Sequence, residues 1–240
     1  MENKNINITG AGYETGVIAK TFISNVFSYM GAALAITAVI SYWFGLNESL
    51  MSYLINYELG KPTTLGWAVM FAPLGFVLLM SFGFNKLSAS ALLVLFITYA
   101  AVMGLSLSFI FMTYTSGSIF TTFGVTAGMF GFMAILGYTT QTDLTKFGSI
   151  LMMGVVGIVI ASVVNWFVGS ATMDYIISFL GVLIFTGLTA YDVQKLKRIG
   201  SGVELGSESA NKLSVMGALT LYLDFINLFL FLLRFLGNRK

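Results

Sequence analysis

The chain has 240 residues, of which 57% are hydrophobic and 9% are charged. Soluble domains carry about 25% charged residues, so this chain lacks the polar groups to coat a water-soluble globule. Cysteine and histidine are absent, which excludes disulfides, thiolate catalysis, Ser/His/Asp triads and the usual zinc ligands. The net charge of +2 predicts no nucleic-acid partner.

The hydrophobic pattern predicts an all-α polytopic membrane protein. Residues 1–21 are polar and punctuated by glycine, so they are interpreted as a short tail before a membrane domain of residues 22–240. A bilayer core requires about 20 apolar residues per helix. Seven segments qualify, at roughly 22–45, 65–84, 88–112, 118–138, 148–168, 175–197 and 213–236. The boundaries near 112–118 and 168–175 are the weakest, and a count of six or eight spans would require one of them to be reassigned.

Glycines at spacings of three and four residues predict close helix packing. Small residues let membrane helices approach one another, because lipid supplies no hydrophobic force that pairs them. Two groups have this spacing: Gly124, Gly128 and Gly131 in the fourth segment, and Gly154 and Gly157 in the fifth.

The distribution of Lys and Arg between the loops predicts the orientation. With seven spans, eight basic residues share the face of the N-terminal tail: Lys4, Lys20, Lys86, Lys146, Lys195, Lys197, Arg198 and Lys212. Four lie on the other face: Lys61, Arg234, Arg239 and Lys240. This asymmetry favours a cytoplasmic N-terminus.

Asp224 is the only acid in the last apolar segment, LTLYLDFINLFLFLLRF at residues 219–235. A charged side chain near the bilayer centre costs about 2.5–3.5 kcal/mol on insertion scales. Steps of three and four residues from Asp224 reach a partly polar helix face: Gly217, Thr220, Asn227, Phe231 and Arg234. We therefore expect Asp224 to face the protein interior or a water-filled cavity, with Thr220 and Asn227 as supporting polar groups.

Asp192 is a second acid within an apolar segment, in FTGLTAYDVQKLKR at residues 185–198. Thr189 precedes it by one turn on the same face, and the basic residues Lys195, Lys197 and Arg198 follow it. A short polar loop joins this helix to the next, so the two helices are antiparallel and can be neighbours. Reflection of position 192 through the loop leaves the two acids mismatched in depth by about 13 Å, which tilt or unequal helix ends would have to absorb.

If the two acids meet, they form a proton-sensitive pair. Two carboxylates in a low-dielectric site cannot both ionise cheaply, so the pair holds a shared proton, and a rise in pH or an entering cation disrupts it. Asp192 and Asp224, with Asn227, threonine and water, could bind Ca²⁺ weakly and transiently, without any resident cofactor. The alternative is local pairing, with Asp192 meeting Lys195 at the membrane edge.

Three other charged residues have simpler interpretations. Asp143 in GYTTQTDLTKFGSI precedes a predicted helix and is expected to cap its N-terminus. Asp174 in GSATMDY is interpreted in the same way. Lys86 lies in the polar hairpin NKLS between the second and third segments, where a gating contact with an acid is the alternative to a plain hairpin charge.

The sequence resembles the Bax inhibitor-1 family, in its bacterial branch. The likeness is carried by GYTTQTDLTKFGSILMMGVVGIVIASVVNWF, GLTAYDVQKLK and GALTLYLDFINLFLFLLRFLGNRK, and it extends over roughly residues 22–240. The resemblance implies a seven-helix fold with a central last helix surrounded by the other six. It also implies a pH-sensitive calcium leak with a proton-sharing sensor, which by motif is formed by Asp192 and Asp224.

The resemblance implies further features. Some relatives have an arginine at the cytoplasmic end of the second helix that bonds to the acid pair, where this chain offers only FGFNKLS, with Lys86. Bacterial relatives are associated with a membrane-bound ATP-dependent protease, as substrate or modulator. A bacterial inner (plasma) membrane location follows from the same likeness.

Other function classes remain open. Presenilin-type intramembrane proteases also combine YD with a second aspartate, but that aspartate lies in GxGD and a PAL motif follows. Here Asp224 lies in LYLDF and no PAL occurs, so we expect no enzyme. A non-transporting regulator that binds other membrane proteins is the main alternative, and proton-coupled transport of another solute would use the same acid pair.

Overall fold

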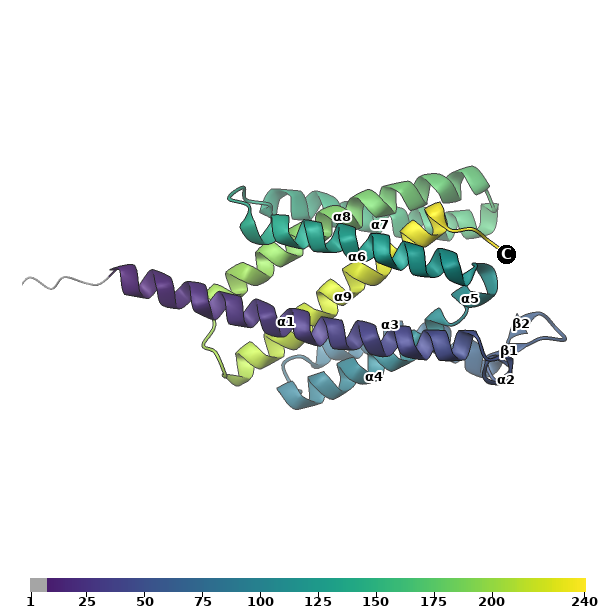
Figure 1. The fold of residues 1–240 in the computed structure, drawn as a ribbon, viewed down its shortest axis with the longest axis horizontal. Coiled ribbons are helices and arrows are strands. Elements are labelled where there is room, and N and C mark those ends of the chain that lie inside the picture. The colour runs from purple at the N-terminus through teal and green to yellow at the C-terminus, as the bar shows by residue number, and fades with distance from the viewer. Residues whose placement is uncertain (1–7) are drawn as a thin grey trace, which may run out of the picture.

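The computed structural model describes the backbone of residues 8–240 and the side chains of residues 18–240, and it consists of long helices packed side by side (Figure 1). The long helices are α1 (Ile8–Gly45), α3 (Thr64–Gly83), α4 (Ala89–Leu107), α6 (Ser116–Thr139), α7 (Thr145–Val168), α8 (Ala171–Ser201) and α9 (Glu208–Leu236). Within this described part, seven stretches are long and apolar enough to cross a membrane. The chain is therefore an all-α polytopic membrane protein, as the sequence predicts.

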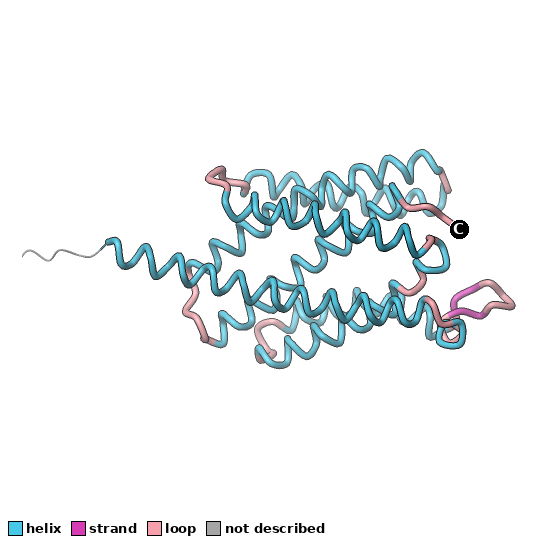
Figure 2. Tube along the Cα trace, in the orientation of Figure 1, coloured by secondary structure: helices cyan, strands magenta, loops and turns pink. Residues whose placement is uncertain are grey.

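The remaining elements are short and lie at one end of the bundle (Figure 2). They are α2 (Glu48–Met51), β1 (Ile55–Asn56), β2 (Lys61–Pro62) and α5 (Ile110–Thr113). The two strands form an antiparallel hairpin in which Ile55 lies opposite Pro62. The hairpin turn is stabilised by Asn56, whose side-chain oxygen accepts hydrogen bonds from the backbone N–H groups of Glu58 and Leu59.

Both of the weakest predicted boundaries are breaks between helices. Thr115 caps α6, because its hydroxyl accepts a hydrogen bond from the N–H of Ser118 at 3.3 Å. Gly169 follows α7 with a φ of 68°, a left-handed conformation that glycine adopts without steric cost. Ser170 then caps α8 by accepting from the N–H of Met173. The count of seven spans is therefore confirmed.

Helix α1 begins earlier than the sequence predicts. It starts at Ile8, so residues 8–21 of the predicted tail are helical, whereas residues 1–7 lie outside the described residues. The described stretch Ile18–Gly45 of α1 is long and apolar enough to span a membrane, and it contains the predicted span of residues 22–45. The reason for the difference is that polar composition limits a span but does not end a helix, and this segment contains no proline.

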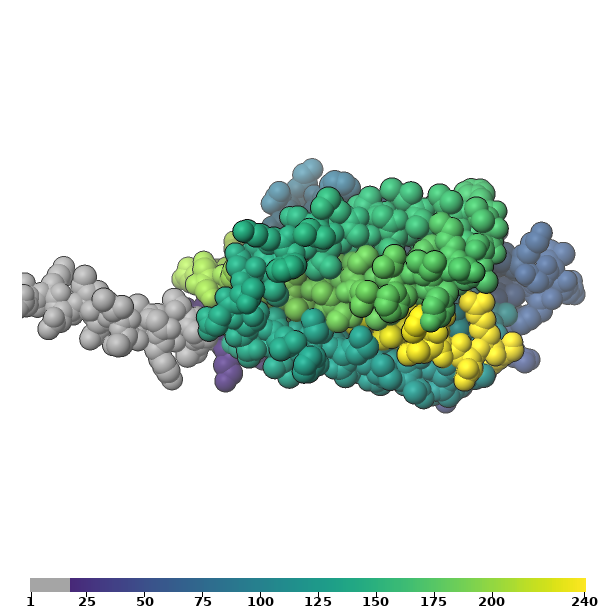
Figure 3. Space-filling view, turned by 90° about the horizontal axis from the view of Figure 1, so that it is seen from above, coloured from purple at the N-terminus to yellow at the C-terminus, as the bar shows by residue number. Residues whose placement is uncertain are grey.

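Helix α9 is the central helix of the bundle. Its most apolar window is 67% buried within the protein, compared with 11% for α7. It packs mainly against α8, α1, α6 and α4, whereas α3 packs on α4 and α7 on α8. The predicted central last helix is confirmed, but four helices rather than six make its main contacts. The space-filling view shows α6, α7 and α8 together on one broad face of the molecule, with the end of α9 beside them (Figure 3).

The glycine prediction is partly wrong. A Cβ atom added at Gly124, Gly128, Gly131 or Gly157 would meet nothing within 4 Å, so these glycines do not mediate close packing within the chain. Close approach occurs at Gly154, where a Cβ would lie 2.9 Å from the side chain of Ile184, and at Gly137, where it would overlap the backbone of α8. Spacing alone identifies a helix face, but it does not tell whether that face meets protein or lipid.

Candidate functional site

The two acids predicted as a pair lie together in the interior of the bundle. Asp224 on α9 is 5% exposed, and Asp192 on α8 is 8% exposed. Their carboxyl groups act on one another electrostatically and lie within hydrogen-bonding reach. The second carboxyl oxygen of Asp224 has no hydrogen-bond partner among the described residues. Because a carboxylate cannot donate, a hydrogen bond between the two groups requires that one of them carries a proton.

Packing on both sides of the acids sets their common depth. On one side, Leu196 of α8 packs against Gly217 of α9, where an added Cβ would lie 2.6 Å from the leucine side chain. On the other side, the rings of Phe185 and Phe231 stack with centroids 5.8 Å apart. Asp192 lies between Phe185 and Leu196, and Asp224 lies between Gly217 and Phe231. This register removes the depth mismatch expected from reflection through the loop.

Local pairing does not replace the contact between the acids. Among the described residues, no ion pair within 4 Å joins Asp192 to Lys195, although the ammonium group acts on the carboxyl electrostatically. Lys195 is exposed and lies 5.9 Å from the ring centre of Tyr191. Asp192 is therefore influenced by one exposed cation and one buried acid.

The predicted supporting polar groups are bonded within their own helices. The hydroxyl of Thr189 donates to the carbonyl of Phe185 at 2.8 Å, and that of Thr220, which is exposed, donates to Met216 at 3.1 Å. The side-chain amide of Asn227 donates to the carbonyl of Leu223 at 2.8 Å. These bonds satisfy the side chains locally, so their first partner is the helix backbone and not the acid pair.

Lys86 does not contact the acid pair. It is exposed in the turn between α3 and α4, and its backbone N–H donates to the carbonyl of Gly83. The α3–α4 turn lies beside the start of α9, where the N–H of Ala89 donates to the side chain of Glu208, about four helical turns before Asp224. The structure therefore gives no support to a gating contact from Lys86.

A polar cluster near the pair was not predicted from the sequence. The hydroxyl groups of Thr37 on α1 and Tyr222 on α9 are 2.7 Å apart, and Thr37 also donates to the carbonyl of Ala100 on α4 at 2.8 Å. The ring of Tyr99 meets that of Tyr222 edge to face, and its hydroxyl has no partner among the described residues. The tyrosine two residues before Asp224 was the available signal, whereas nothing in the sequence connects it to Thr37.

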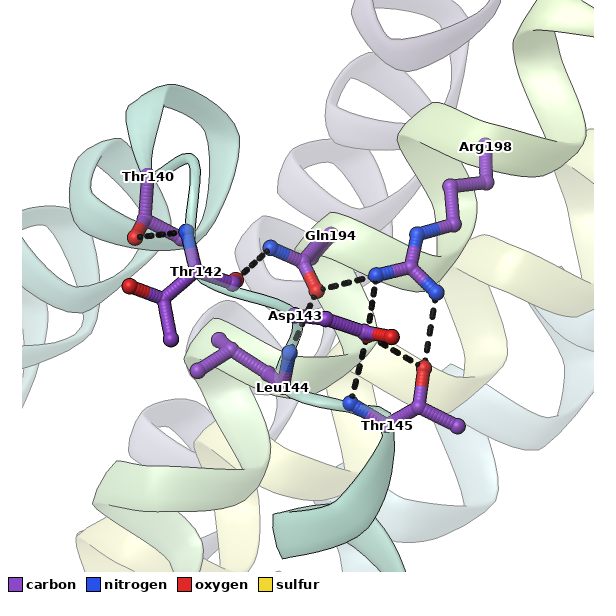
Figure 4. Close-up of polar contacts among 7 residues, drawn as sticks. All are labelled: Thr140, Thr142, Asp143, Leu144, Thr145, Gln194 and Arg198. Atoms are coloured by element: carbon purple, nitrogen blue, oxygen red, sulfur yellow. Dashed lines mark hydrogen bonds and ion pairs between the residues drawn. The ribbon is translucent and has the colours of Figure 1, made fainter.

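Asp143 stabilises the α6–α7 loop and also connects it to α8 (Figure 4). One of its carboxyl oxygens accepts hydrogen bonds from the N–H and the hydroxyl of Thr145, at 3.0 and 2.6 Å, and from the guanidinium of Arg198. The Thr145 hydroxyl and the Arg198 guanidinium hold the pKa of Asp143 well below its ordinary value. The predicted contact with the helix start is present, although Leu144 occupies the N-cap position.

Asp174 has a different role from the predicted one. Ser170 caps α8, and Asp174 lies one turn further along the helix. Its carboxyl oxygens lie 3.3 Å from the guanidinium of Arg234 and 3.5 Å from that of Arg239. Asp174 therefore joins the start of α8 to the end of α9, at the opposite end of the bundle from Asp143.

The fold and the buried pair define a polytopic α-helical membrane protein with two interacting acids on its last two helices. A family model described as "Inhibitor of apoptosis-promoting Bax1" matches residues 19–240, and the chain belongs to this family, the Bax inhibitor-1 family. The predicted resemblance is therefore confirmed.

Several bacterial proteins are similar over nearly their full length. A protein of Borreliella burgdorferi is 45% identical over 224 residues, which cover 93% of this chain and 94% of the relative. The inner membrane protein YbhL of Escherichia coli K12 is 44% identical over 222 residues, covering 92% and 93%. A membrane protein of Streptococcus pyogenes is 35% identical over 219 residues, covering 90% and 92%.

Proposed function

We propose that the protein is a pH-sensitive calcium leak of the bacterial inner membrane, controlled by a proton shared between Asp192 and Asp224. The observation that carries this proposal is the approach of two buried acids from neighbouring antiparallel helices, with no ion pair to Lys or Arg among the described residues. Ionisable groups inside a membrane bundle are expensive and commonly mark ion or proton pathways.

The chemistry of the pair suits a gate that responds to protons. With one proton, the two carboxyl groups hydrogen-bond and hold α8 against α9. Without it, two negative charges remain in a low-dielectric site, where they repel one another and attract a cation. Calcium requires six to eight oxygen ligands, so two carboxyl groups and water hold it weakly, and a weak site lets the ion leave.

A pocket with several polar lining residues lies at the C-terminal end of α9, where a cation could enter the protein. It lies between the first turns of α6 and the end of α9 and has a volume of about 360 Å³. Its polar lining residues are Thr115, Ser118, Thr121, Thr122 and Asn238. Hydroxyl and amide oxygens are suitable contacts for a hydrated cation. We propose this pocket as the aqueous mouth on the face opposite the basic loops.

The proposed orientation places the N-terminus in the cytoplasm. The loops α3–α4, α6–α7 and α8–α9 lie at the end of the bundle from which α1 starts, and the C-terminus lies at the other end (Figure 1). Among the described residues, basic side chains are more numerous at the first end, seven against four, and cytoplasmic loops carry such an excess. Because the chain has no cysteine, single cysteines introduced in these loops can be labelled from either side of the membrane to test the orientation.

The alternative function is regulation of another membrane protein, such as a membrane-bound ATP-dependent protease, without transport. The test is reconstitution of the pure protein into liposomes that contain a calcium-sensitive dye. A dye response that depends on pH and on Asp224 supports the leak, and the absence of any response contradicts it in favour of the regulator. We also propose that the protein is not an enzyme. Incubation of the pure protein with helical membrane substrates tests this, because cleavage of a substrate would contradict it.

A further inference from the structure

The α6–α7 loop binds α8 on the side opposite Asp192. With 3.6 residues per turn, each residue advances by about 100° around the helix axis. The residues of α8 that contact the α6–α7 hairpin share one face: Ala190, Tyr191, Gln194, Lys197 and Arg198. Asp192 projects at about 160° from the centre of that face. The α6–α7 hairpin therefore contacts the face of α8 that is opposite the face carrying Asp192.

Gln194 anchors the loop through its backbone. Its side-chain oxygen accepts a hydrogen bond from the N–H of Leu144 at 2.9 Å, and its amide nitrogen donates to the carbonyl of Thr142 at 2.8 Å. The side chain is buried, so these bonds are made away from water, where an unpaired amide is costly. Gln194 is two residues from Asp192, and Figure 4 shows it between the loop and Arg198.

Arg198 extends the same contact by one turn. Its guanidinium donates to the oxygen of Gln194 and to the hydroxyl of Thr145, both at 2.7 Å, and it also binds Asp143. A planar guanidinium can bridge several acceptors in a fixed geometry, which an ammonium group cannot do. Arg198 thus connects α8, the loop and the start of α7 in one network.

Two further sets of contacts join this part of α8 to α6 and α7. The ammonium group of Lys197 donates to the carbonyl of Tyr138 at 2.8 Å and lies 4.7 Å from the centre of its ring. Gly137 and Gly148 meet Ala190 and Tyr191 so closely that an added Cβ would overlap them. Helices α6 and α7 therefore contact the two edges of this one face of α8.

We propose that the α6–α7 loop is a positioning clamp, and that Gln194 and Arg198 are positioning residues that fix how closely Asp192 approaches Asp224. The inference rests on the proposed function, because the clamp would determine the pH at which the proton shared by Asp192 and Asp224 is released. A proton held by two adjacent carboxyl groups is bound more tightly than by either group alone. The contacts on the opposite face fix the rotation of α8 about its axis, and without them Asp192 can turn away from Asp224, so that the proton leaves at a lower pH.

The charges around the acid pair are few, so a change in the distance between the two carboxyl groups can be distinguished from a change in the charges near them. Among the described residues, the groups that act on the pair from α8 and α9 are the two acids themselves and Lys195. Tyr138 of α6 and Lys197 lie on the clamp side of α8, and Lys146 of α7 is exposed. Asp143 remains ionised at neutral pH because its pKa is lowered, so the clamp itself does not titrate with the pair.

The test uses two substitutions that leave the net charge unchanged. Gln194→Met keeps the length of the side chain and removes both loop bonds, and Arg198→Lys keeps the charge and removes the planar fork. We expect each to move the midpoint of pH-dependent calcium flux in liposomes toward acid by at least about half a pH unit. Lys146→Gln, in the same hairpin, changes an exposed charge and is expected to leave the midpoint unchanged.

A second readout is infrared titration of the carboxyl stretching band of the acid pair. The band is identified by its loss in Asp192→Asn and Asp224→Asn. It should shift in the same direction in both clamp variants, whether or not ions flow. If the parent protein has no pH-dependent flux, the proposed function fails, and the infrared titration still decides the clamp. If Gln194→Met and Arg198→Lys lower only the melting temperature and leave the infrared midpoint at the parental value, the clamp is purely structural and the inference is overturned.

Discussion

Gly137 on α6 rests directly against the backbone of Ala190 on α8, leaving no room for a side chain at position 137. Gly128, about two and a half turns earlier on α6, has open space around it. We therefore expect Gly137→Ala to destabilise the protein by about 1–3 kcal/mol, because overpacking forces the backbones apart. Gly128→Ala should be neutral or stabilising, since alanine is the better helix former. Thermal unfolding in detergent measures both, and equal effects would contradict the close contact.

The acid pair predicts a loss of pH response on neutralisation. In Asp224→Asn and Asp192→Asn, only one carboxyl group remains, so no proton is shared and calcium flux should become independent of pH or be held in one state. Asp174→Asn is the matched control, because this acid lies at the other end of the bundle in an ion pair with Arg234. Flux assays across pH 5–8 in liposomes compare the three variants. Retention of the parental pH profile by both pair variants would refute proton sharing.

The cluster around Thr37 predicts unequal costs for removing its two hydroxyl groups. Tyr222→Phe leaves Thr37 bonded to the carbonyl of Ala100, so it should cost only about 0.5–1.5 kcal/mol. Thr37→Val leaves the buried Tyr222 hydroxyl without its partner and removes the second hydrogen bond to the carbonyl of Ala100, which lies within α4, so about 1–3 kcal/mol is expected. The double variant should cost less than the sum, because the shared bond is counted once. Additive costs in thermal unfolding would show that the hydroxyl groups do not interact.

Asp143 predicts a pH dependence of stability that differs from that of the buried pair. Its pKa is lowered in the folded protein, first by Thr145 and then by Arg198. Its contribution is therefore present above the ordinary carboxyl range and is lost as pH falls through the folded value. Asp143→Asn should lower the melting temperature at neutral pH, and this difference from the parent protein should shrink in strong acid. Since Asp143 is exposed, high salt should reduce the difference as well.

The sequence predicted those parts of the molecule that are encoded by local pattern. Apolar length gave the seven spans, and an isolated acid in each of the last two predicted burial of Asp192 and Asp224, because exposure to lipid would be too costly. The contact between the acids required the register of α8 against α9. That register depends on packing at Gly217 and Phe231, and no spacing rule reveals it.

The incorrect predictions involve partners that are distant in the sequence. Asp174 looked like a helix cap because its partner Arg234 is 60 residues away. The Gly124, Gly128 and Gly131 series has the spacing of a packing face, but lipid and protein are both apolar, so hydrophobic pattern does not distinguish them. By contrast, Lys86 is exposed in the α3–α4 turn, which agrees with the plain hairpin charge that the sequence offers as its simpler interpretation.

The central position of α9 has a consequence for biogenesis. A ribosome makes the chain from its N-terminus, so the other long helices enter the membrane before the helix on which α1, α4, α6 and α8 converge. During that interval, Thr37 and Asp192, the partners of Tyr222 and Asp224, have already been synthesised, but α9, which contacts both of them, has not. Final assembly of this bundle must therefore wait until synthesis of α9 is complete, and a chain truncated before Glu208 lacks its organising centre.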